Sequence, residues 1–396
     1  MTKKILYLTY FFEPDLGAGS FRNSALAESL SARSDGQAEI TLITTQPNRY
    51  ESLREAAPVY EKRNNMEIHR IPVRGSSGSI LDQVYSFAQF FYAARKISEK
   101  STYDLVFASS SKFFTAWLGF ILAKKQNAKL YIDLRDLFTE NLKEFIRIRW
   151  VADLTARIIQ SLFERPCLRY ASHINVNSEG FLSSLGKENI SKTSFYPNGI
   201  DDFFIGCKQS DQLPESPKII CYAGNIGEGQ GLEKIIPPLA KMLGSDWRIR
   251  IIGDGSNKLK LEESLTKQGI ENTEIIPPVR RKELLKYYSE AHYLLVHLND
   301  YESFKKVIPS KLFEYGCTDL PILAGVSGYA REFIQKYIPE GVYLFDPCDA
   351  QAAYRILQSF PPEKFQRPDF INRFSRKKIS DEMSDSIMCL LQTKPS

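Results

Sequence analysis

The sequence predicts an α/β protein made of two doubly wound, Rossmann-like domains that face each other across a cleft. Strand-like and helix-like segments alternate from end to end of the 396 residues. Several strand-like segments are apolar throughout, which is typical of parallel strands covered by helices on both faces. The alternation stops at the polar, proline-containing segment 208–217 and then starts again, which indicates a domain boundary.

The two halves repeat the same kind of element order. In the first half we expect strands at 4–11, 39–44, 67–71, 105–109, 129–134 and 173–177, and helices at 20–32, 80–99, 113–125 and 148–170. In the second half we expect strands at 218–222, 248–252, 274–276, 293–297, 321–323 and 342–345, with helices between them. We place the domains at 1–205 and 206–368. A helical segment at 369–396 could pack back across either domain.

The composition excludes several classes of protein. No apolar run reaches the roughly 18 residues that span a bilayer, and the six cysteines form no CxxC pair, which is typical of reduced thiols in the cytoplasm. The four histidines form no HExxH motif, so we expect no metal held by the protein. A net charge of +5 without a dense basic tract argues against a nucleic-acid partner and suits an anionic substrate or membrane surface.

The segment 307–314 carries the most informative functional pattern. It follows the strand expected at 293–297 and opens a helix, with Ser310 as the expected N-cap. Backbone N–H groups at a helix start suit a phosphate, and Lys311 adds a full charge there. Glu314 lies on the same helix face and could bind the vicinal hydroxyls of a ribose. These residues suit a nucleoside diphosphate, although a capped helix with surface charges explains them equally well.

A glycine-containing turn follows the first strand of each half. Gly17 and Gly19 lie in the first turn, and Gly224, Asn225 and Gly227 lie in the second. Glycines in such turns let the backbone approach a ligand closely. The first turn is not a dinucleotide fingerprint, because an arginine stands at position 22. A tight turn without a ligand is the alternative for each, but two such turns together with segment 307–314 favour a ligand.

The strand at 129–134 ends in charged residues. Its last aspartate is followed by Leu134, Arg135 and Asp136, so charge is expected at the carboxyl edge of the sheet. Arg135 could contact a sugar or a phosphate, and Asp136 could accept sugar hydroxyls or the proton of an acceptor. A surface Asp–Arg pair or a helix cap is the alternative.

Taken in order, these segments resemble the retaining glycosyltransferases of family 4, which have the two-domain GT-B fold. Further motifs of that family follow one another here as NSEG at 177–180, PNGID at 197–201, YAGN at 222–225 and IGDG at 252–255. The Asp-Leu-Arg-Asp and Pro-Ser-Lys-Leu-Phe-Glu segments are similar to those of members that build bacterial O-antigen, capsule or exopolysaccharide repeat units. The resemblance covers residues 3–345.

The resemblance implies transfer of a sugar, with retention, from a nucleoside-diphosphate sugar to a glycan or a polyprenyl-diphosphate-linked acceptor, with UDP as the expected nucleotide. The first domain would hold the acceptor and the second the nucleotide sugar, without a tightly bound cofactor or a metal. The expected catalytic residues are Arg135, Asp136 and Lys311. The expected donor-binding residues are Gly17, Gly19, Gly224, Asn225, Gly227, Ser310, Lys311 and Glu314.

Three positions depart from the pattern of the family. Lys306 stands where many members carry the first glutamate of a pair, so only Glu314 of that pair carries over. Gln230 stands where many carry a lysine that binds the diphosphate, and Lys311 is our candidate to replace that cation. Arg135 stands where many carry a histidine.

Segment 141–172 suggests contact with a membrane. Basic and apolar residues are interspersed along it, and the aromatic segment 86–92 covers more than one helical face. Both suit a surface that rests on anionic lipid, so we expect a cytoplasmic protein at the inner face of the cytoplasmic membrane. A long core helix with a solvated basic face is the alternative.

Two other functions fit the same sequence features. A sugar-nucleotide epimerase of the same fold would convert a nucleotide sugar without an acceptor. A non-catalytic relative acting as a subunit would keep the nucleotide site but show no turnover, and Lys306 gives that hypothesis some support. Turnover with a panel of nucleotide sugars, with and without an acceptor, distinguishes the three.

Overall fold

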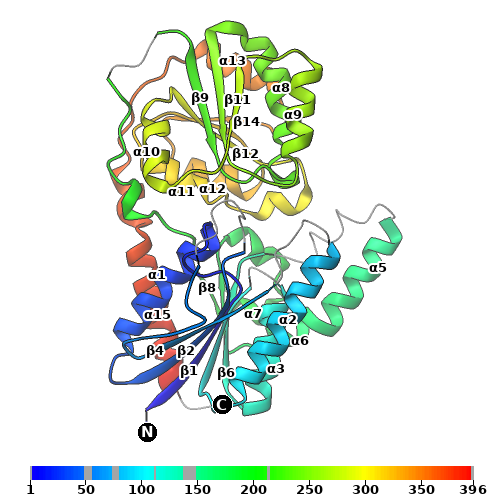
Figure 1. Cartoon of the computed structure of the whole chain (residues 1–396), viewed down its shortest axis with the longest axis vertical. Helices are drawn as coiled ribbons and strands as arrows, with labels where there is room; N and C mark the ends of the chain where they lie inside the picture. Colours follow the sequence, from blue (N-terminus) through cyan, green and yellow to red (C-terminus); the bar gives the residue numbers. More distant parts are fainter. Residues whose placement is uncertain are drawn as a thin grey trace. The chain divides into compact units, whose positions relative to one another are not determined.

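The computed structural model describes residues 2–48, 56–73, 80–110, 113–136, 149–211 and 215–393 (Figure 1). The chain divides into two compact units. The first unit comprises Met1–Gly199 and Arg376–Ser396, and the second comprises Ile200–Ser375. Each is described by itself below.

The first unit is built on an eight-stranded sheet with the strand order β3-β4-β2-β1-β5-β6-β7-β8. All neighbouring strands are parallel except β3, which is antiparallel to β4. The strands are β1 (Lys3–Thr9), β2 (Ala38–Thr45), β3 (Tyr60–Arg63), β4 (Met66–Ile71), β5 (Leu105–Ser109), β6 (Lys129–Leu134), β7 (His173–Val176) and β8 (Thr193–Phe195). The sequence analysis missed β3 and β8, because one is a polar edge strand and the other has only three residues.

Helices cover both faces of this sheet. Helices α1 (Ala18–Arg33) and α15 (Arg376–Gln392) lie side by side on one face, where their apolar residues pack on those of β1, β2 and β5 (Figure 1). Helices α2 (Ile80–Ser98) and α3 (Phe113–Gln126) lie on the other face. A short helix, α7 (Lys187–Ile190), follows β7.

The expected helix 148–170 is three pieces in the described part of the chain. They are α5 (Arg149–Ile159), a π-helical turn (Gln160–Glu164) and α6 (Arg165–Tyr170). The sequence pattern could not separate them because the helical backbone continues through the wider turn, where Ile159 and Arg165 both keep right-handed helical angles.

The second unit has a six-stranded sheet, and all its neighbouring strands are parallel, in the order β11-β10-β9-β12-β13-β14. The strands are β9 (Lys218–Ala223), β10 (Trp247–Ile252), β11 (Thr273–Ile276), β12 (Tyr293–His297), β13 (Ile322–Gly325) and β14 (Val342–Phe345). The helices are α8 (Leu232–Leu243), α9 (Lys258–Lys267), α10 (Arg281–Ser289), α11 (Lys311–Gly316), α12 (Tyr329–Tyr337), α13 (Ala350–Ser359) and α14 (Pro368–Arg373). Two parallel sheets covered by helices confirm the doubly wound α/β class.

Each glycine turn lies at the point where the strand order of its sheet reverses direction. In the first unit β1 stands between β2 and β5, and in the second β9 stands between β10 and β12. Ligands of open α/β sheets bind beyond the carboxyl ends of strands at such switch points. The turns after β1 and β9 therefore occupy the two positions where this fold favours a ligand.

The units end at different residues from those expected. Residues 200–205 belong to the second unit, because Asp201 forms an ion pair with Arg281 and Phe204 is buried against Tyr288. Helix α14 also stays there, since Phe370 and Phe374 pack on Phe313. Helix α15 alone returns to the first unit, where it packs on α1.

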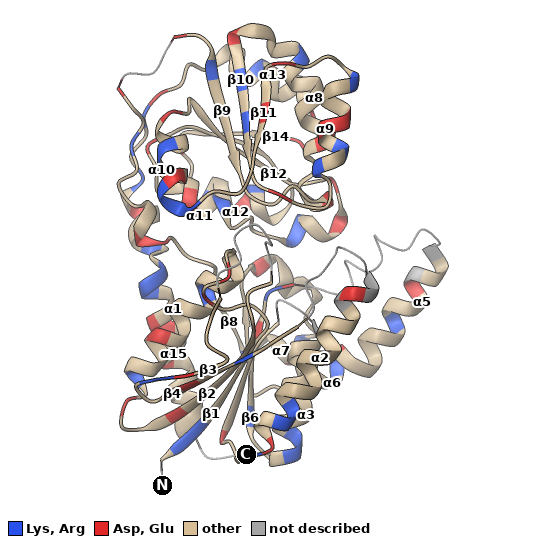
Figure 2. Cartoon of the chain, viewed as in Figure 1, with Lys and Arg blue, Asp and Glu red and all other residues tan. Residues whose placement is uncertain are grey.

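Acidic and basic residues are interspersed along the helices of both units in Figure 2. This mixture agrees with the mild net charge and shows no dense basic helix among the labelled elements. No helix within the described ranges is both long enough and apolar enough to cross a membrane.

Candidate functional site

The glycine turn of the second unit packs against the turn that follows β10. The Gly224 and Ile226 amides donate to the carbonyls of Ile252 and Asp254, both at 2.8 Å. A Cβ atom on Gly253 would lie 1.8 Å from the Gly224 carbonyl oxygen, so no side chain fits at that position. The IGDG motif is therefore the support on which the glycine turn rests.

Lys311 lies across this turn. A Cβ atom on Gly224 would meet its Cε and Nζ atoms at 2.2 and 2.3 Å, so any side chain at position 224 would displace the ammonium group. Nζ lies 5.4 Å from the ring centre of Tyr222 and 5.9 Å from that of Tyr315, within the range of a cation–π attraction. The structure thus brings the expected residues Gly224 and Lys311 into direct contact.

Glu314 is held from the neighbouring helix α10. The Tyr288 hydroxyl donates to its Oε2 at 3.3 Å, and Tyr288 is fully buried. Burial raises the pKa of Tyr288 well above its ordinary value, so this hydroxyl stays protonated and donates. The buried Tyr315 hydroxyl accepts from the Ala223 amide at 3.0 Å, which ties α11 to the end of β9.

Ser310 directly precedes α11, as expected, but it is not a side-chain cap. Its backbone is already helical, with φ −58° and ψ −25°, and its hydroxyl makes no capping bond. The Leu312 and Phe313 amides instead donate to the Pro309 and Ser310 carbonyls. The capping part of the expectation is therefore wrong, because the chain turns into the helix one residue earlier than a cap requires.

Gln230 fastens the glycine turn. Its Oε1 accepts from the Asn225 side-chain amide at 2.8 Å and from the Gly227 backbone amide at 3.2 Å. A ligand that takes the Gly227 N–H must replace this bond. Sequence analysis noted Gln230 only as a missing lysine and did not find its contact with the turn.

The first-unit residues also meet. Gly17 precedes α1, and the Gly19 carbonyl accepts from the Arg135 guanidinium at 3.4 Å. Arg135 donates as well to the Asn198 side-chain oxygen at 3.4 Å. Asp136 is exposed at the last described position before residue 149. The structure thus brings Gly19 and Arg135 together and leaves Asp136 at the surface of its unit.

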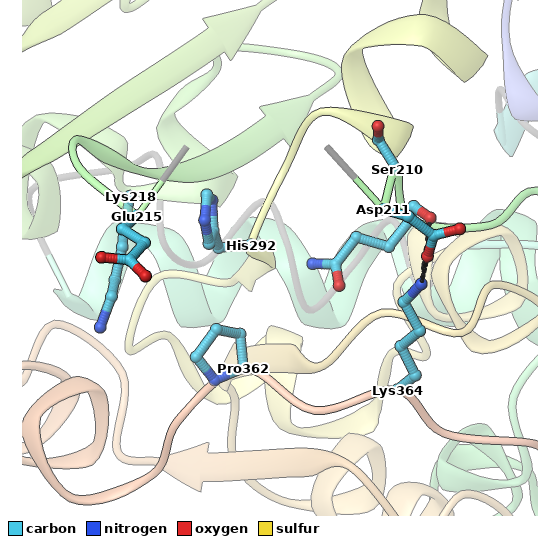
Figure 3. A pocket seen from close by; sticks show the side chains of 8 residues that line it. Ser210, Asp211, Glu215, Lys218, His292, Pro362 and Lys364 are labelled. Atoms are coloured by element: carbon cyan, nitrogen blue, oxygen red, sulfur yellow. Dashed lines mark hydrogen bonds and ion pairs between the residues drawn. The ribbon is translucent and has the colours of Figure 1, made fainter. Parts of the chain in front are cut away.

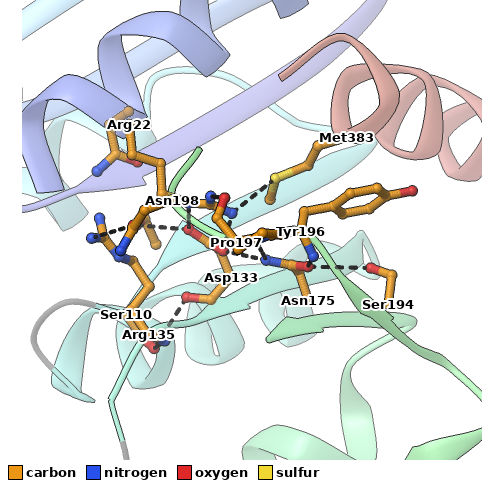
Figure 4. Close-up of polar contacts among 12 residues, drawn as sticks. Arg22, Ser110, Asp133, Arg135, Asn175, Ser194, Tyr196, Pro197, Asn198 and Met383 are labelled. Carbon is orange, nitrogen blue, oxygen red and sulfur yellow. Dashed lines mark hydrogen bonds and ion pairs between the residues drawn. The ribbon is translucent and has the colours of Figure 1, made fainter. Parts of the chain in front are cut away.

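A buried ion pair that sequence analysis missed lies beneath these residues (Figure 4). Arg22 donates to both carboxylate oxygens of Asp133, at 3.1 and 2.9 Å, and the two residues are 3% and 0% exposed. Asn175 donates to the same carboxylate at 2.7 Å. Burial alone would raise the pKa of Asp133, but the charge and hydrogen bonds of Arg22, with the charge of Arg135, hold that pKa below its ordinary value.

The two segments expected to contact a membrane differ in exposure. Residues 137–148, which include Lys143 and Arg147, lie outside the described residues. On α5 and the following π-helical turn, large apolar side chains recur every fourth residue with about half or more of their surface exposed. They are Trp150 (71%), Leu154 (52%), Ile158 (47%) and Leu162 (60%).

The aromatic segment 86–92, which was expected to suit a lipid surface, is only partly exposed. Ser86 and Phe90 are buried, and Phe87 packs against Tyr10 and Phe114. Tyr92 remains 70% exposed. The segment therefore lies partly buried, because α2 covers the sheet.

A pocket of about 630 Å³ lies elsewhere in the second unit (Figure 3). It adjoins Lys218, the first residue of β9, and His292, which precedes β12. The amino ends of these strands are opposite to the edge that carries the glycine turn, and none of the candidate residues lines the pocket. Its lining residues are Gln209, Ser210, Asp211, Glu215, Lys218, His292, Pro362 and Lys364. Within the described residues no cluster of three or more His, Cys, Asp or Glu side chains could hold a metal ion.

The sequence profile of a known family matches most of the second unit. The sequence profile of the family "Glycosyl transferases group 1" matches residues 207–374. A protein of Escherichia coli (strain K12), WcaI, is named as a glycosyl transferase of colanic acid biosynthesis and is 26% identical over 130 residues. That match covers 30% of this chain and 32% of WcaI, so it spans about a third of the relative's length.

Solved structures share the fold over nearly the whole chain. Sucrose-phosphate synthase from Thermosynechococcus elongatus superposes with a TM-score of 0.73 at 16% identity, covering 98% of this chain and 99% of that one. The Anabaena protein HepE, solved in complex with UDP and glucose, superposes with a TM-score of 0.65 at 15% identity, with the same coverage. At such low identity these similarities establish the fold alone.

Proposed function

We propose that this chain, in which residues 207–374 match the profile of the group 1 glycosyl transferases, transfers a sugar, with retention, from a UDP-sugar to a glycan or polyprenyl-diphosphate-linked acceptor. The observation that carries the proposal is the contact of Lys311 with the Gly224 turn. It places a cation against backbone that no side chain covers, at the switch point of a parallel sheet. The setting in cell-surface polysaccharide synthesis is supported by the similarity to WcaI.

The difficult step is departure of the nucleoside diphosphate from the anomeric carbon. Negative charge grows on the leaving phosphate, so a fixed cation and fixed N–H groups should contribute most to catalysis. Lys311 would supply the cation that Gln230 does not, and the Gly227 amide would donate to the diphosphate once it is released from Gln230. The leaving phosphate would accept the acceptor proton in a front-face attack.

Glu314 would bind the ribose hydroxyls. A carboxylate can accept two hydrogen bonds from a vicinal diol, and Tyr288 fixes one of its oxygens. Asn225 and Ser310 would contribute polar contacts beside it. These contacts would be the same in the ground state and the transition state, so they should govern donor affinity.

The first unit would hold the acceptor. Gly17 and Gly19 bring no side chains of their own to the start of α1, and Arg135 brings a positive charge to Gly19. Arg135 would contact the acceptor sugar or its phosphate, and Asp136 would accept its hydroxyls. The exposed stripe on α5 and the π-helical turn would rest on the anionic inner face of the cytoplasmic membrane, because exposed Arg157 on α5 and Arg165 at the start of α6 accompany its apolar side chains.

The decisive experiment is UDP release from a panel of nucleotide sugars, with and without a short-chain polyprenyl diphosphate that carries one sugar. A glycosyltransferase releases UDP faster when the acceptor is present and extends the acceptor by one sugar. An epimerase converts the donor sugar without the acceptor. Absence of turnover with every donor, combined with UDP binding, would indicate that the protein is a non-catalytic nucleotide-binding subunit.

A further inference from the structure

We propose that Arg22 is a positioning residue: its buried ion pair with Asp133 sets the relative places of the first-unit glycine turn, the Arg135–Asp136 strand end and the segment that leads out of the unit. The inference rests on the proposed function for its catalytic consequence. Its structural part, the fixing of three segments by one guanidinium, can be tested without that function.

One guanidinium joins four separate pieces of the chain. Arg22 lies three residues after Gly19 on α1, and its partner Asp133 lies on β6, two residues before Arg135. The remaining guanidinium nitrogen, Nη1, donates to the Pro197 carbonyl, and Nη2, which also bonds Asp133, reaches the Met383 sulfur on α15 at 3.3 Å. The two chain connections between the units, after Gly199 and before Arg376, lie two residues from Pro197 and seven residues from Met383.

Two other arginines hold the same exit segment, Pro197–Gly199. Arg135 donates to the Asn198 side-chain oxygen, and Arg376 donates to the Asn198 and Gly199 carbonyls at 3.3 Å. A Cβ atom on Gly199, where φ is +73°, would lie 2.8 Å from the Arg376 Cα atom. The exit segment is therefore closely held on several sides, and Arg22 is the arginine among the three with a fully buried carboxylate partner.

The geometry distinguishes positioning from simple stabilisation. A buried ion pair adds little net stability compared with neutral groups of similar shape, yet its two-pronged contact fixes the guanidinium in one orientation. The Pro197 contact depends on that orientation. Replacing the pair by neutral residues should therefore leave the unit folded and release the exit segment and the glycine turn.

The test uses the full chain with the double variant Arg22→Met/Asp133→Asn. Asparagine keeps the bond from Asn175, and methionine fills the volume of the arginine stem without reaching Pro197. We expect a melting temperature close to that of the wild type, an unchanged response to UDP, and faster amide hydrogen exchange at residues 18–23 and 194–200. The kcat for sugar transfer should fall about 100-fold, the scale of a misplacement near 1 Å, with the donor KM unchanged.

Two further variants sharpen the test. Arg22→Lys keeps a positive charge beside Asp133, but its single ammonium cannot span both partners, so its melting temperature should stay close to that of the wild type while its kcat falls. Arg33→Met is the matched control, since Arg33 also joins α1 to α15, through Asp381 and Asp385, at the far end of the helix. Arg33→Met should leave kcat and the amide hydrogen exchange at residues 18–23 and 194–200 at wild-type values.

Two results would overturn the inference. If exchange at residues 18–23 and 194–200 is unaltered in the folded double variant, Arg22 does not fix these segments. If kcat is unaltered while exchange rises, the segments move without consequence for transfer. A wild-type protein that turns over no nucleotide sugar would instead refute the proposed function, and the exchange measurement would still decide the positioning role.

Discussion

At the scale of single residues, the second-unit site depends on the absence of a side chain at position 224. Lys311 fills the space that a side chain on Gly224 would take, between the rings of Tyr222 and Tyr315. The aromatic rings attract the ammonium without neutralising it. The ammonium group therefore lies at the turn where a phosphate would arrive.

Lys311→Met should lower kcat by about 10²–10³-fold, the cost of removing one donor to a developing negative charge. The variant should stay folded, because a methionine preserves most of the stem packing. Steady-state kinetics beside a thermal melt would measure both. Lys336→Met is the control, since Lys336 also lies over a tyrosine ring in the second unit, 4.9 Å from the centre of Tyr337. A folded Lys311→Met with wild-type kcat would remove Lys311 from the leaving-group site.

Tyr288→Phe should raise the donor KM by about 2–10-fold with kcat unchanged. The substitution removes the hydroxyl that holds Glu314, and one hydrogen bond contributes about 0.5–1.5 kcal/mol. Glu314→Ala should act in the same direction and more strongly, because uniform binding energy is lost from ground and transition states alike. An effect of Tyr288→Phe on kcat alone would contradict a ribose-binding role for Glu314.

The sequence could predict the Gly224 turn and Lys311 because each lies in a short local pattern. It could not predict the Arg22–Asp133 pair, whose members are 111 positions apart in the chain. Arg22 lies in a helix pattern and Asp133 in a strand pattern. Neither local pattern predicts that these two charged side chains form an ion pair in the folded protein. The capping of α11 failed for a different reason, since the side-chain preference of serine was overridden by an earlier helical turn.

At the scale of elements, α5 exposes large apolar side chains along one face. Trp150 and Leu154 are 71% and 52% exposed, whereas surface helices normally direct such residues inward. Leu162 lies within the π-helical turn at Gln160–Glu164, and it is exposed like Trp150, Leu154 and Ile158 before it. A continuous apolar stripe flanked by arginines is suited to a lipid interface.

Leu154→Ser together with Leu162→Ser should weaken binding to vesicles that contain anionic lipid, by about tenfold for each leucine. Losing about 1.5 kcal/mol of apolar burial per side chain corresponds to that factor. Flotation with such vesicles at low and high salt would measure the binding. Leu259→Ser is the control, because Leu259 is also an exposed leucine (71%) but lies in the second unit. Wild-type protein that does not float at low salt would disprove the membrane contact.

Strand β12 ends in a histidine that should make the second unit sensitive to acid. Burial lowers the pKa of His297 to about 4. Its Nε2 accepts from the Cys348 amide, so Nδ1 must carry the proton that is donated to the Gln230 carbonyl. A second proton has no place on this ring in the folded state.

In the unfolded chain the histidine takes up that proton near pH 6.5. The contribution of neutral His297 to the free energy of unfolding is therefore fully present above pH 6.5 and is lost as the pH falls toward 4. His297 should account for about 3 kcal/mol of the loss. Urea unfolding between pH 4 and pH 7 would show it, and His297→Gln should flatten the dependence. The dependence that remains belongs in part to His173 in the first unit, whose pKa burial also lowers to about 4. An unaltered slope in His297→Gln would contradict this assignment.

At the scale of the whole molecule, the two units place their glycine turns at equivalent points of two parallel sheets. The doubly wound class was predictable because apolar strands and helices alternate along the chain. The ends of the units were not, because contacts of Asp201, Phe204 and Phe374 decide them. Because each turn lies within its own unit, a ligand bound at one turn should protect the helices and strands of that unit.

UDP should stabilise the protein by about 2.7 kcal/mol at roughly 100 times its Kd, and the added protection should be local. We expect amide hydrogen exchange to slow at residues 224–231 and 309–315, where Gly227 and Lys311 would contact the diphosphate. The pocket beside Lys218, His292 and Lys364 provides an internal comparison, since it lies at the opposite ends of the same strands. Protection confined to that pocket would place the nucleotide there and refute the site at Lys311. Protection at the glycine turn that Lys311→Met weakens would tie the nucleotide to the lysine, because this substitution changes one charge and leaves the turn's backbone intact.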